Sequence, residues 1–233
     1  MNIGLLQCDH VSEPFQHIIS DYPQAFRDLF AKHAPDISLR IYDVCHGELP
    51  QSVEECEGYV ITGSKHSVYE DIPWIHQLAE FVRQVHTQKH KLVGICFGHQ
   101  IIAHALGGKV AKAQVGWGIG TKPVSIEHPK NWMLPEKQTY HLLLSHQDQV
   151  MTLPEGAEAL GGNEHCPISM IGVGEHLLGI QAHPEFTTAY AEALMDSRVE
   201  RIGREPIQAA KATLNTPTDE ATIAHWIEAF LKA

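Results

Sequence analysis

The chain has 233 residues, 43% of them hydrophobic, which is enough to build one sizeable core. Its 28 acidic residues outnumber 17 basic ones, and the net charge of -11 without a basic cluster argues against a nucleic-acid partner. No stretch approaches the ~20 apolar residues of a membrane span, and the N-terminus lacks the basic and apolar segments of a signal peptide.

The first half alternates short apolar runs with helical patterns. Strands are predicted at 3–8, 38–44, 58–62 and 91–95, and helices at 23–34 and from about 73 to 88. Strands that alternate with helices of this length are typical of βαβ units. We therefore predict a mostly parallel sheet.

The second half contains many short runs bounded by glycines and prolines. They predict antiparallel strands near 110 and at 119–126, 140–145, 168–173 and 177–181. Helices are predicted at 187–203 and 219–231. No repeat or linker interrupts the chain. The sequence thus predicts a single α/β domain over 1–233, with a doubly wound, mostly parallel sheet and an additional small antiparallel sheet in the second half.

The cysteines are odd in number and widely spaced. This pattern is typical of a chain kept in the reducing cytoplasm, where we expect this protein. No CxxC pair, HExxH motif or zinc-type spacing occurs among the five cysteines and 17 histidines, so we predict no metal site and no cofactor.

One cysteine, Cys96, stands where an apolar run meets a helical pattern, between Gly94 and Gly98. A strand, a sharp turn and a helix in immediate succession form a nucleophile elbow, here with sulfur in place of oxygen. The N–H groups and dipole at the helix start favour the thiolate. The alternative is a buried structural cysteine, but that would not need a glycine two residues away on each side.

A cysteine nucleophile needs a base and a group that orients the base. His183 and Glu185 follow a predicted strand two residues apart, so in an extended chain their side chains point to the same side. The alternative is an ordinary surface pair at a strand end. Gly63 also ends an apolar strand, and its N–H together with that of Phe97 is predicted to form an oxyanion hole.

The elbow GICFGHQ, the HPE element and the TGS turn resemble class I, triad-type glutamine amidotransferases in both sequence and order, over about residues 2–200. The resemblance implies the flavodoxin-like amidotransferase fold, with Cys96 as nucleophile, His183 as acid and base, and Glu185 as the residue that orients His183. It also implies substrate contacts in three segments. These residues are Ser64, Gln100, Ser145, His146 and Gln147.

Two positions depart from the family pattern. Gln147 stands where the family more often has glycine before Asp148, and Gln114 begins a segment, continued by Trp117, that usually starts with an acidic residue. The alternative for Trp117 is a core role. We expect the loops around Gln114 and Gln147 to decide which leaving group is accepted.

The sequence leaves three functions open. The first is a glutamine amidotransferase that releases ammonia for an acceptor on a separate synthetase subunit, because no P-loop or other ATP-binding segment is visible. The second is a γ-glutamyl peptidase that cleaves γ-glutamyl amides such as glutathione conjugates, which the elbow, the Gly63-Ser64 turn and the helix start at Trp74 also resemble. The third is a regulatory or binding protein without activity, against which the complete triad argues.

Overall fold

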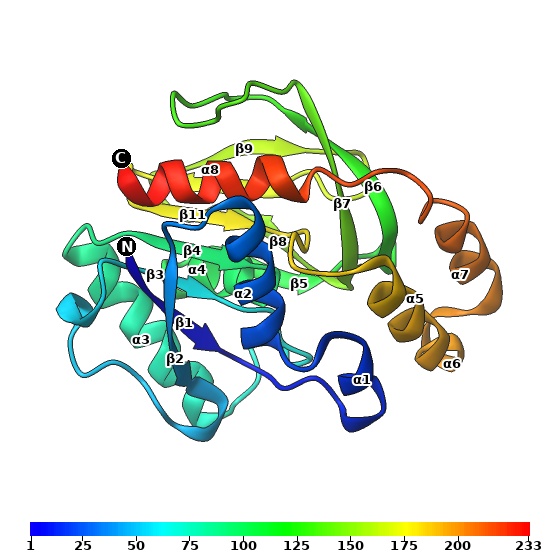
Figure 1. Ribbon diagram of the computed structural model, residues 1–233, viewed down its shortest axis with the longest axis horizontal. Coiled ribbons are helices and arrows are strands. Elements are labelled where there is room, and N and C mark those ends of the chain that lie inside the picture. The colour runs from blue at the N-terminus through cyan, green and yellow to red at the C-terminus, as the bar shows by residue number, and fades with distance from the viewer.

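The computed structural model describes all residues 1–233 and has a nine-stranded sheet flanked by helices, with a separate two-stranded sheet (Figure 1). The strands are β1 (Asn2–Gln7), β2 (Ser38–Asp43), β3 (Gly58–Ile61), β4 (Leu92–Ile95), β5 (Lys109–Lys112), β6 (Gly118–Ile126), β7 (Thr139–His146), β8 (Asp148–Thr152), β9 (Ala157–Gly162), β10 (Met170–Val173) and β11 (Leu177–Ile180). The helices are α1 (Gln16–Ile19), α2 (Tyr22–His33), α3 (Pro73–Thr87), α4 (Phe97–Ala105), α5 (Thr188–Ser197), α6 (Val199–Ile202), α7 (Arg204–Lys211) and α8 (Glu220–Lys232).

The large sheet has the strand order β2-β1-β3-β4-β11-β10-β9-β6-β7. Its first five strands are parallel, and the remaining four continue it in antiparallel fashion. In the pairing of β4 with β11, Ile95 lies opposite Ile180. The segments that follow these two strands therefore leave the sheet side by side at the same edge.

The inner parallel strands β3, β4 and β11 are buried on both faces, whereas the edge strand β2 is partly exposed. Val60 and Val93 face a core shared with α2 and α8, whereas Tyr59 and Leu92 face a core shared with α3 and α4. This alternation follows the two-residue period of a strand, and it explains why β3 and β4 are apolar at every position. Figure 1 shows α2 and α8 side by side on one face of the sheet.

The predicted fold class is confirmed: helices cover both faces of the sheet, and β5 pairs with β8 in a small separate antiparallel sheet. The predicted strands appear within a few residues of their expected bounds. Most of the antiparallel strands, however, extend the large sheet. β8 and β9 were not predicted, because neither the DQVMT run nor the AEALGG run carries a regular apolar alternation.

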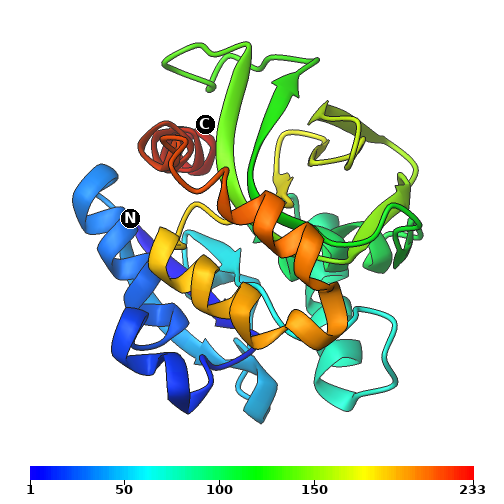
Figure 2. The same cartoon turned by 90° about the vertical axis from the view of Figure 1, so that its right-hand side faces the viewer.

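The helix predicted over 187–203 is wrong in its length. It ends at Ser197, and α6 and α7 follow as separate helices. Arg198 takes a non-helical backbone conformation at the first break, and Gly203, with φ of 96°, makes the second. Figures 1 and 2 show these three helices as one group beside the sheet, on the side toward which β1 points. None of the helices has both the length and the apolar character that a bilayer span requires.

Candidate active site

Cys96 stands at the turn between β4 and α4. Its backbone has φ of 54° and ψ of -99°, a region that residues with a side chain rarely adopt. The turn is held by a hydrogen bond from the Cys96 N–H to the carbonyl oxygen of Ile180, 2.8 Å away on β11. A Cβ on Gly94 would lie 2.2 Å from the carbonyl oxygen of Gly98, so glycine is required for strand and helix to approach. The structure thus has the predicted elbow geometry.

His183 and Glu185 follow the neighbouring strand β11. Their side chains meet, with Nδ1 of His183 2.8 Å from Oε1 of Glu185, and both are almost fully buried. The ring of His183 is also stacked on Phe186 at 3.8 Å between centroids. The sequence predicted that His183 and Glu185, two residues apart in an extended segment, point to the same side. The contact between the imidazole and the carboxylate agrees with that prediction.

The charge environment of His183 is unusual for a buried histidine. Burial alone lowers the pKa of an imidazole, because the charged form loses its water. Here the charges of Glu185 and Cys96 outweigh burial and raise the pKa of His183 to about 10. The ring therefore holds its proton at neutral pH.

Gly63 lies against both reacting side chains. A Cβ on Gly63 would be 2.9 Å from Cε1 of His183 and 3.7 Å from Cβ of Cys96. Phe97 is the first residue of α4, so its N–H has no acceptor within the helix. The two residues predicted as oxyanion donors are thus both next to Cys96.

A cleft with two arms opens at Cys96. The smaller arm, of about 200 Å³, also contains the five residues predicted to contact substrate, and we call it the Gln147 arm. The larger arm, of about 280 Å³, we call the Tyr190 arm. Residues common to both arms are Ser64, Lys65, Cys96, Ser145, Arg198 and Arg201. Further residues of the Tyr190 arm are Asp9, His10, Ser12, Phe15, Tyr22, His183, Phe186, Tyr190, Leu194 and Ser197.

The surroundings of three predicted contact residues restrict their roles, through protein partners at Gln100 and Ser145 and through burial at His146. The Gln100 amide nitrogen donates to the Asp148 carbonyl oxygen at 2.8 Å and to Oε1 of Gln181 at 3.1 Å, so only its oxygen is free for substrate. The hydroxyl of Ser145 accepts a hydrogen bond from Arg198 at 2.7 Å. His146 is buried with both ring nitrogens unpaired, and burial lowers its pKa to about 3.

The two positions that depart from the family pattern separate in the structure. Gln147 borders the cleft, but Gln114 is exposed and does not. Trp117, three residues after Gln114, does border the cleft, under the guanidinium groups of Arg198 and Arg201. That the loops around Gln114 and Gln147 decide which leaving group is accepted therefore stays a prediction, to which Gln114 contributes no cleft-lining side chain.

Sequence reasoning missed Gln181, Arg198 and Arg201. The Gln181 side-chain nitrogen lies 3.5 Å from Sγ of Cys96. Its position in the strand before His183 was a usable signal, since residues 181 and 183 lie on the same face of an extended chain. The two arginines lie beyond a helix break that the helical periodicity did not reveal, so no comparable signal pointed to them.

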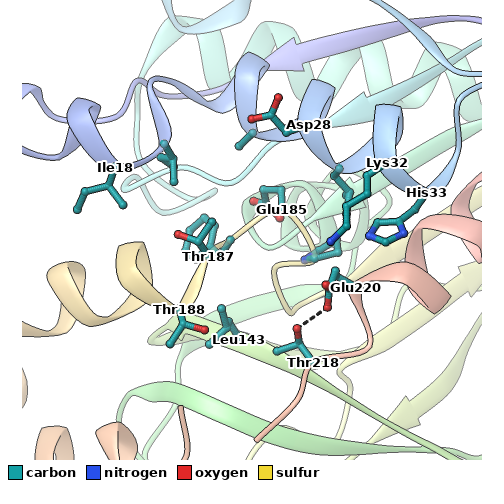
Figure 3. A pocket seen from close by; sticks show the side chains of 15 residues that line it. Ile18, Asp28, Lys32, His33, Leu143, Glu185, Thr187, Thr188, Thr218 and Glu220 are labelled. Carbon is teal, nitrogen blue, oxygen red and sulfur yellow. Dashed lines mark hydrogen bonds between the residues drawn. The ribbon is translucent and has the colours of Figure 1, made fainter. Parts of the chain in front are cut away.

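A separate cavity of about 300 Å³ lies on the other side of Glu185, between α2 and the start of α8. Figure 3 shows Lys32 of α2 and Glu220 of α8 facing each other across it. Neither Cys96 nor His183 borders this cavity. The chemistry of the thiol therefore belongs to the two-armed cleft.

One group of side chains could hold a metal ion. The ligand atoms of His10, Asp43, Cys45 and His46 all lie within 4.8 Å of one another, although His10 is distant from the others in sequence. Asp43 is within hydrogen-bond distance of the other three side chains, so the group is satisfied without an ion. Spacing in the sequence could not reveal this group, because His10 lies far along the chain from the other three residues. The expected absence of a metal site stays a prediction.

Known proteins resemble this chain along most of its length. The family model described as "Glutamine amidotransferase class-I" matches residues 32–198. Gamma-glutamyl peptidase 3 from Arabidopsis thaliana is 30% identical over 91% of this chain and 88% of its own length. A GMP synthase (glutamine-hydrolyzing) from Porphyromonas gingivalis is 29% identical over 72% of this chain but only 32% of its own length.

The fold comparison agrees with the sequence comparisons. The crystal structure of a glutamine amidotransferase from Thermotoga maritima superposes with a TM-score of 0.79, covers 99% of both chains and is 19% identical. At that identity the match supports the fold alone. Together with the family model, which spans well over half of the residues, these matches show that the chain belongs to the class I glutamine amidotransferase family.

Proposed function

We propose that the protein hydrolyses γ-glutamyl amides through a thioester on Cys96. The observation that carries the proposal is that Cys96 and His183 border the same arm of the cleft, with His183 paired to the buried Glu185. A nucleophile, a base and an orienting carboxylate in this arrangement are the parts that acyl transfer requires.

The reaction has two halves. The Cys96 thiolate attacks the γ-carbonyl carbon, and the N–H groups of Gly63 and Phe97 stabilise the oxyanion. His183 gives its proton to the departing nitrogen as the C–N bond breaks, which leaves the γ-glutamyl thioester. His183 then removes a proton from water, the resulting hydroxide attacks the thioester, and glutamate and the Cys96 thiolate are released.

We favour γ-glutamyl peptides as substrates, with an amino acid or peptide as the leaving group. The Tyr190 arm of about 280 Å³ contains His183, the acid that protonates the leaving group. Ammonia needs only about the volume of one water, roughly 30 Å³. The similarity to two γ-glutamyl peptidases over nearly their whole length also supports γ-glutamyl peptides as substrates.

The second candidate is hydrolysis of glutamine, with ammonia passed to a synthetase on a separate subunit. The similarity to a GMP synthase (glutamine-hydrolyzing), which covers 32% of that protein, supports it. In either case we place the reaction in the cytoplasm, since all five cysteines are free thiols.

The test is glutamate release by the purified protein from glutamine and from a γ-glutamyl dipeptide. We expect faster release from the dipeptide and complete loss in Cys96→Ala, whereas Cys56→Ala, which removes a buried thiol outside the cleft, keeps its activity. Added hydroxylamine should divert the thioester to γ-glutamyl hydroxamate. Glutamate release by Cys96→Ala would rule out the thioester, and failure of Cys96 to react with a glutamine-like electrophile would favour a protein without activity.

A further inference from the structure

Two arginines without acidic partners stand where the arms of the cleft meet. The arginine ion pairs of the protein are those of Arg40 and Arg83, and neither Arg198 nor Arg201 has a carboxylate within 4 Å. Arg198 donates to Ser145, and both guanidinium groups lie over the ring of Trp117, at 5.5 and 5.3 Å from its centroid. Their positive charges are therefore held in position but not neutralised.

Arg198 is the more buried of the two arginines. Burial lowers the pKa of its guanidinium, which means that its charge is poorly hydrated. A poorly hydrated charge without a counter-ion is unfavourable unless a ligand supplies the opposite charge. A planar guanidinium fork also matches the geometry of a carboxylate. Arg198 is thus suited to bind a carboxylate that arrives with the substrate, and the exposed Arg201, over the same Trp117 ring, adds a second positive charge.

The charges in the two arms indicate which carboxylate this is. Beyond the shared residues, the Gln147 arm carries two acids, Glu70 and Asp148, and a base, Lys112, which suits the zwitterionic end of a γ-glutamyl group. The acid of the Tyr190 arm, Asp9, is already paired with Lys65 at 2.9 Å. In the Tyr190 arm the arginines therefore provide uncompensated positive charge.

The Tyr190 arm also has the shape of a site for an organic leaving group. Its lining is mostly polar, but Phe15, Tyr22, Phe186, Tyr190 and Leu194 add aromatic and apolar side chains to it. His183 borders this arm, so the nitrogen that it protonates departs on this side.

We propose that Arg198 and Arg201 bind the free carboxylate of the amino acid or peptide that leaves from a γ-glutamyl peptide. This inference rests on the proposed function and adds to it a chemical requirement: the leaving group carries a free carboxylate. Glutamine, whose leaving group is ammonia, gains nothing from the arginine pair in this role.

The test compares a γ-glutamyl dipeptide with its C-terminal carboxamide, which differs only in the charge of the leaving group. We expect wild-type kcat/KM to be about tenfold or more higher for the carboxylate, which is the usual scale for a hydrogen bond between charged groups. Arg201→Gln should remove most of this preference. Arg204→Gln, which removes an exposed positive charge three residues away and outside the cleft, should retain it.

Binding to the Cys96→Ala protein, measured by calorimetry, separates this inference from the proposed function. If neither peptide is hydrolysed, the proposed hydrolysis fails, but a carboxylate preference in binding that depends on Arg201 still supports the site. An equal loss for both peptides in Arg201→Gln would overturn the inference, because the arginine would then serve the γ-glutamyl group or the fold. The absence of any preference in the wild-type protein would overturn it as well.

Discussion

His183 depends on the negative charge of Glu185. That carboxylate is fully buried and makes the largest contribution that raises the pKa of the imidazole. A group whose pKa is higher in the folded state than its usual 6.5 stabilises the fold below that pH, and the stabilisation is lost as the pH rises through the folded-state value of about 10. Activity that needs the His183 proton should disappear over the same alkaline range.

We therefore predict that Glu185→Gln moves the alkaline limb of the kcat/KM profile to lower pH by about one to three units, since an adjacent opposite charge shifts a pKa by this amount. The rate at the optimum should fall by about 10²–10⁴-fold, the usual contribution of a positioned acid or base. Hydrolysis of the γ-glutamyl dipeptide at a series of pH values is the measurement. An unchanged alkaline limb would mean that another group controls it.

The residues that we propose as catalytic could be predicted from the sequence because each lies in a short segment with its own signal. Cys96 has glycines on both sides, and His183 with Glu185 follows a strand in which side chains alternate. Arg198 could not be recognised in this way. Its importance comes from the lack of an acidic partner, which depends on the folding of segments far apart in the chain.

At the scale of elements, the elbow requires β4 and α4 to pack backbone against backbone. A Cβ on Gly94 would meet the Gly98 carbonyl oxygen at 2.2 Å and the His99 nitrogen at 2.7 Å. Backbone atoms cannot move aside without displacing the helix. At Gly63 the nearest neighbour is instead a side-chain atom of His183, which can rotate away.

Because of these contacts, we predict that a glycine-to-alanine substitution has different effects on stability at Gly94 and at Gly63. Gly94→Ala should lower the free energy of unfolding by about 3 kcal/mol, at the upper end of the usual cost of overpacking. Gly63→Ala should change it by less than about 1 kcal/mol but reduce kcat, because the added methyl group displaces the imidazole. Urea unfolding monitored by fluorescence, together with kcat, tests both. Equal destabilisation by the two substitutions would contradict the prediction.

The strands and helices with strong apolar patterns were predictable, and those held by tertiary contacts were not. β3 and β4 are apolar throughout. In α7, by contrast, only Ile207 and Ala210 are buried, and Pro206 stands in its first turn. Such a helix forms because it packs on its neighbours rather than because its own sequence demands it.

At the scale of the whole molecule, one sheet connects the two halves of the chain. β4 from the first half pairs directly with β11 from the second, and apolar residues of both halves share the cores on each face. We propose from this that residues 1–233 form a single domain. The large sheet is continuous across the point where the parallel strands give way to antiparallel ones.

A single domain should unfold in one cooperative step. We predict that tryptophan fluorescence, which reports on Trp74 and Trp226 in opposite layers, and far-ultraviolet circular dichroism give the same midpoint in urea. Two separate midpoints would indicate two domains. Cys96→Ala is a suitable background for the experiment, because it removes the reactive thiol.

The pairing of β4 with β11 has a consequence for the newly made protein. The thiol and the glutamine beside it are 85 residues apart in sequence, so the ends of a long loop must be brought together before the active site exists. Contacts between distant residues form late and slowly during folding. If the proposed function is right, a chain still emerging from the ribosome has its nucleophile but no acid to assist it, and we expect hydrolysis only once synthesis has passed β11 and the sheet has closed.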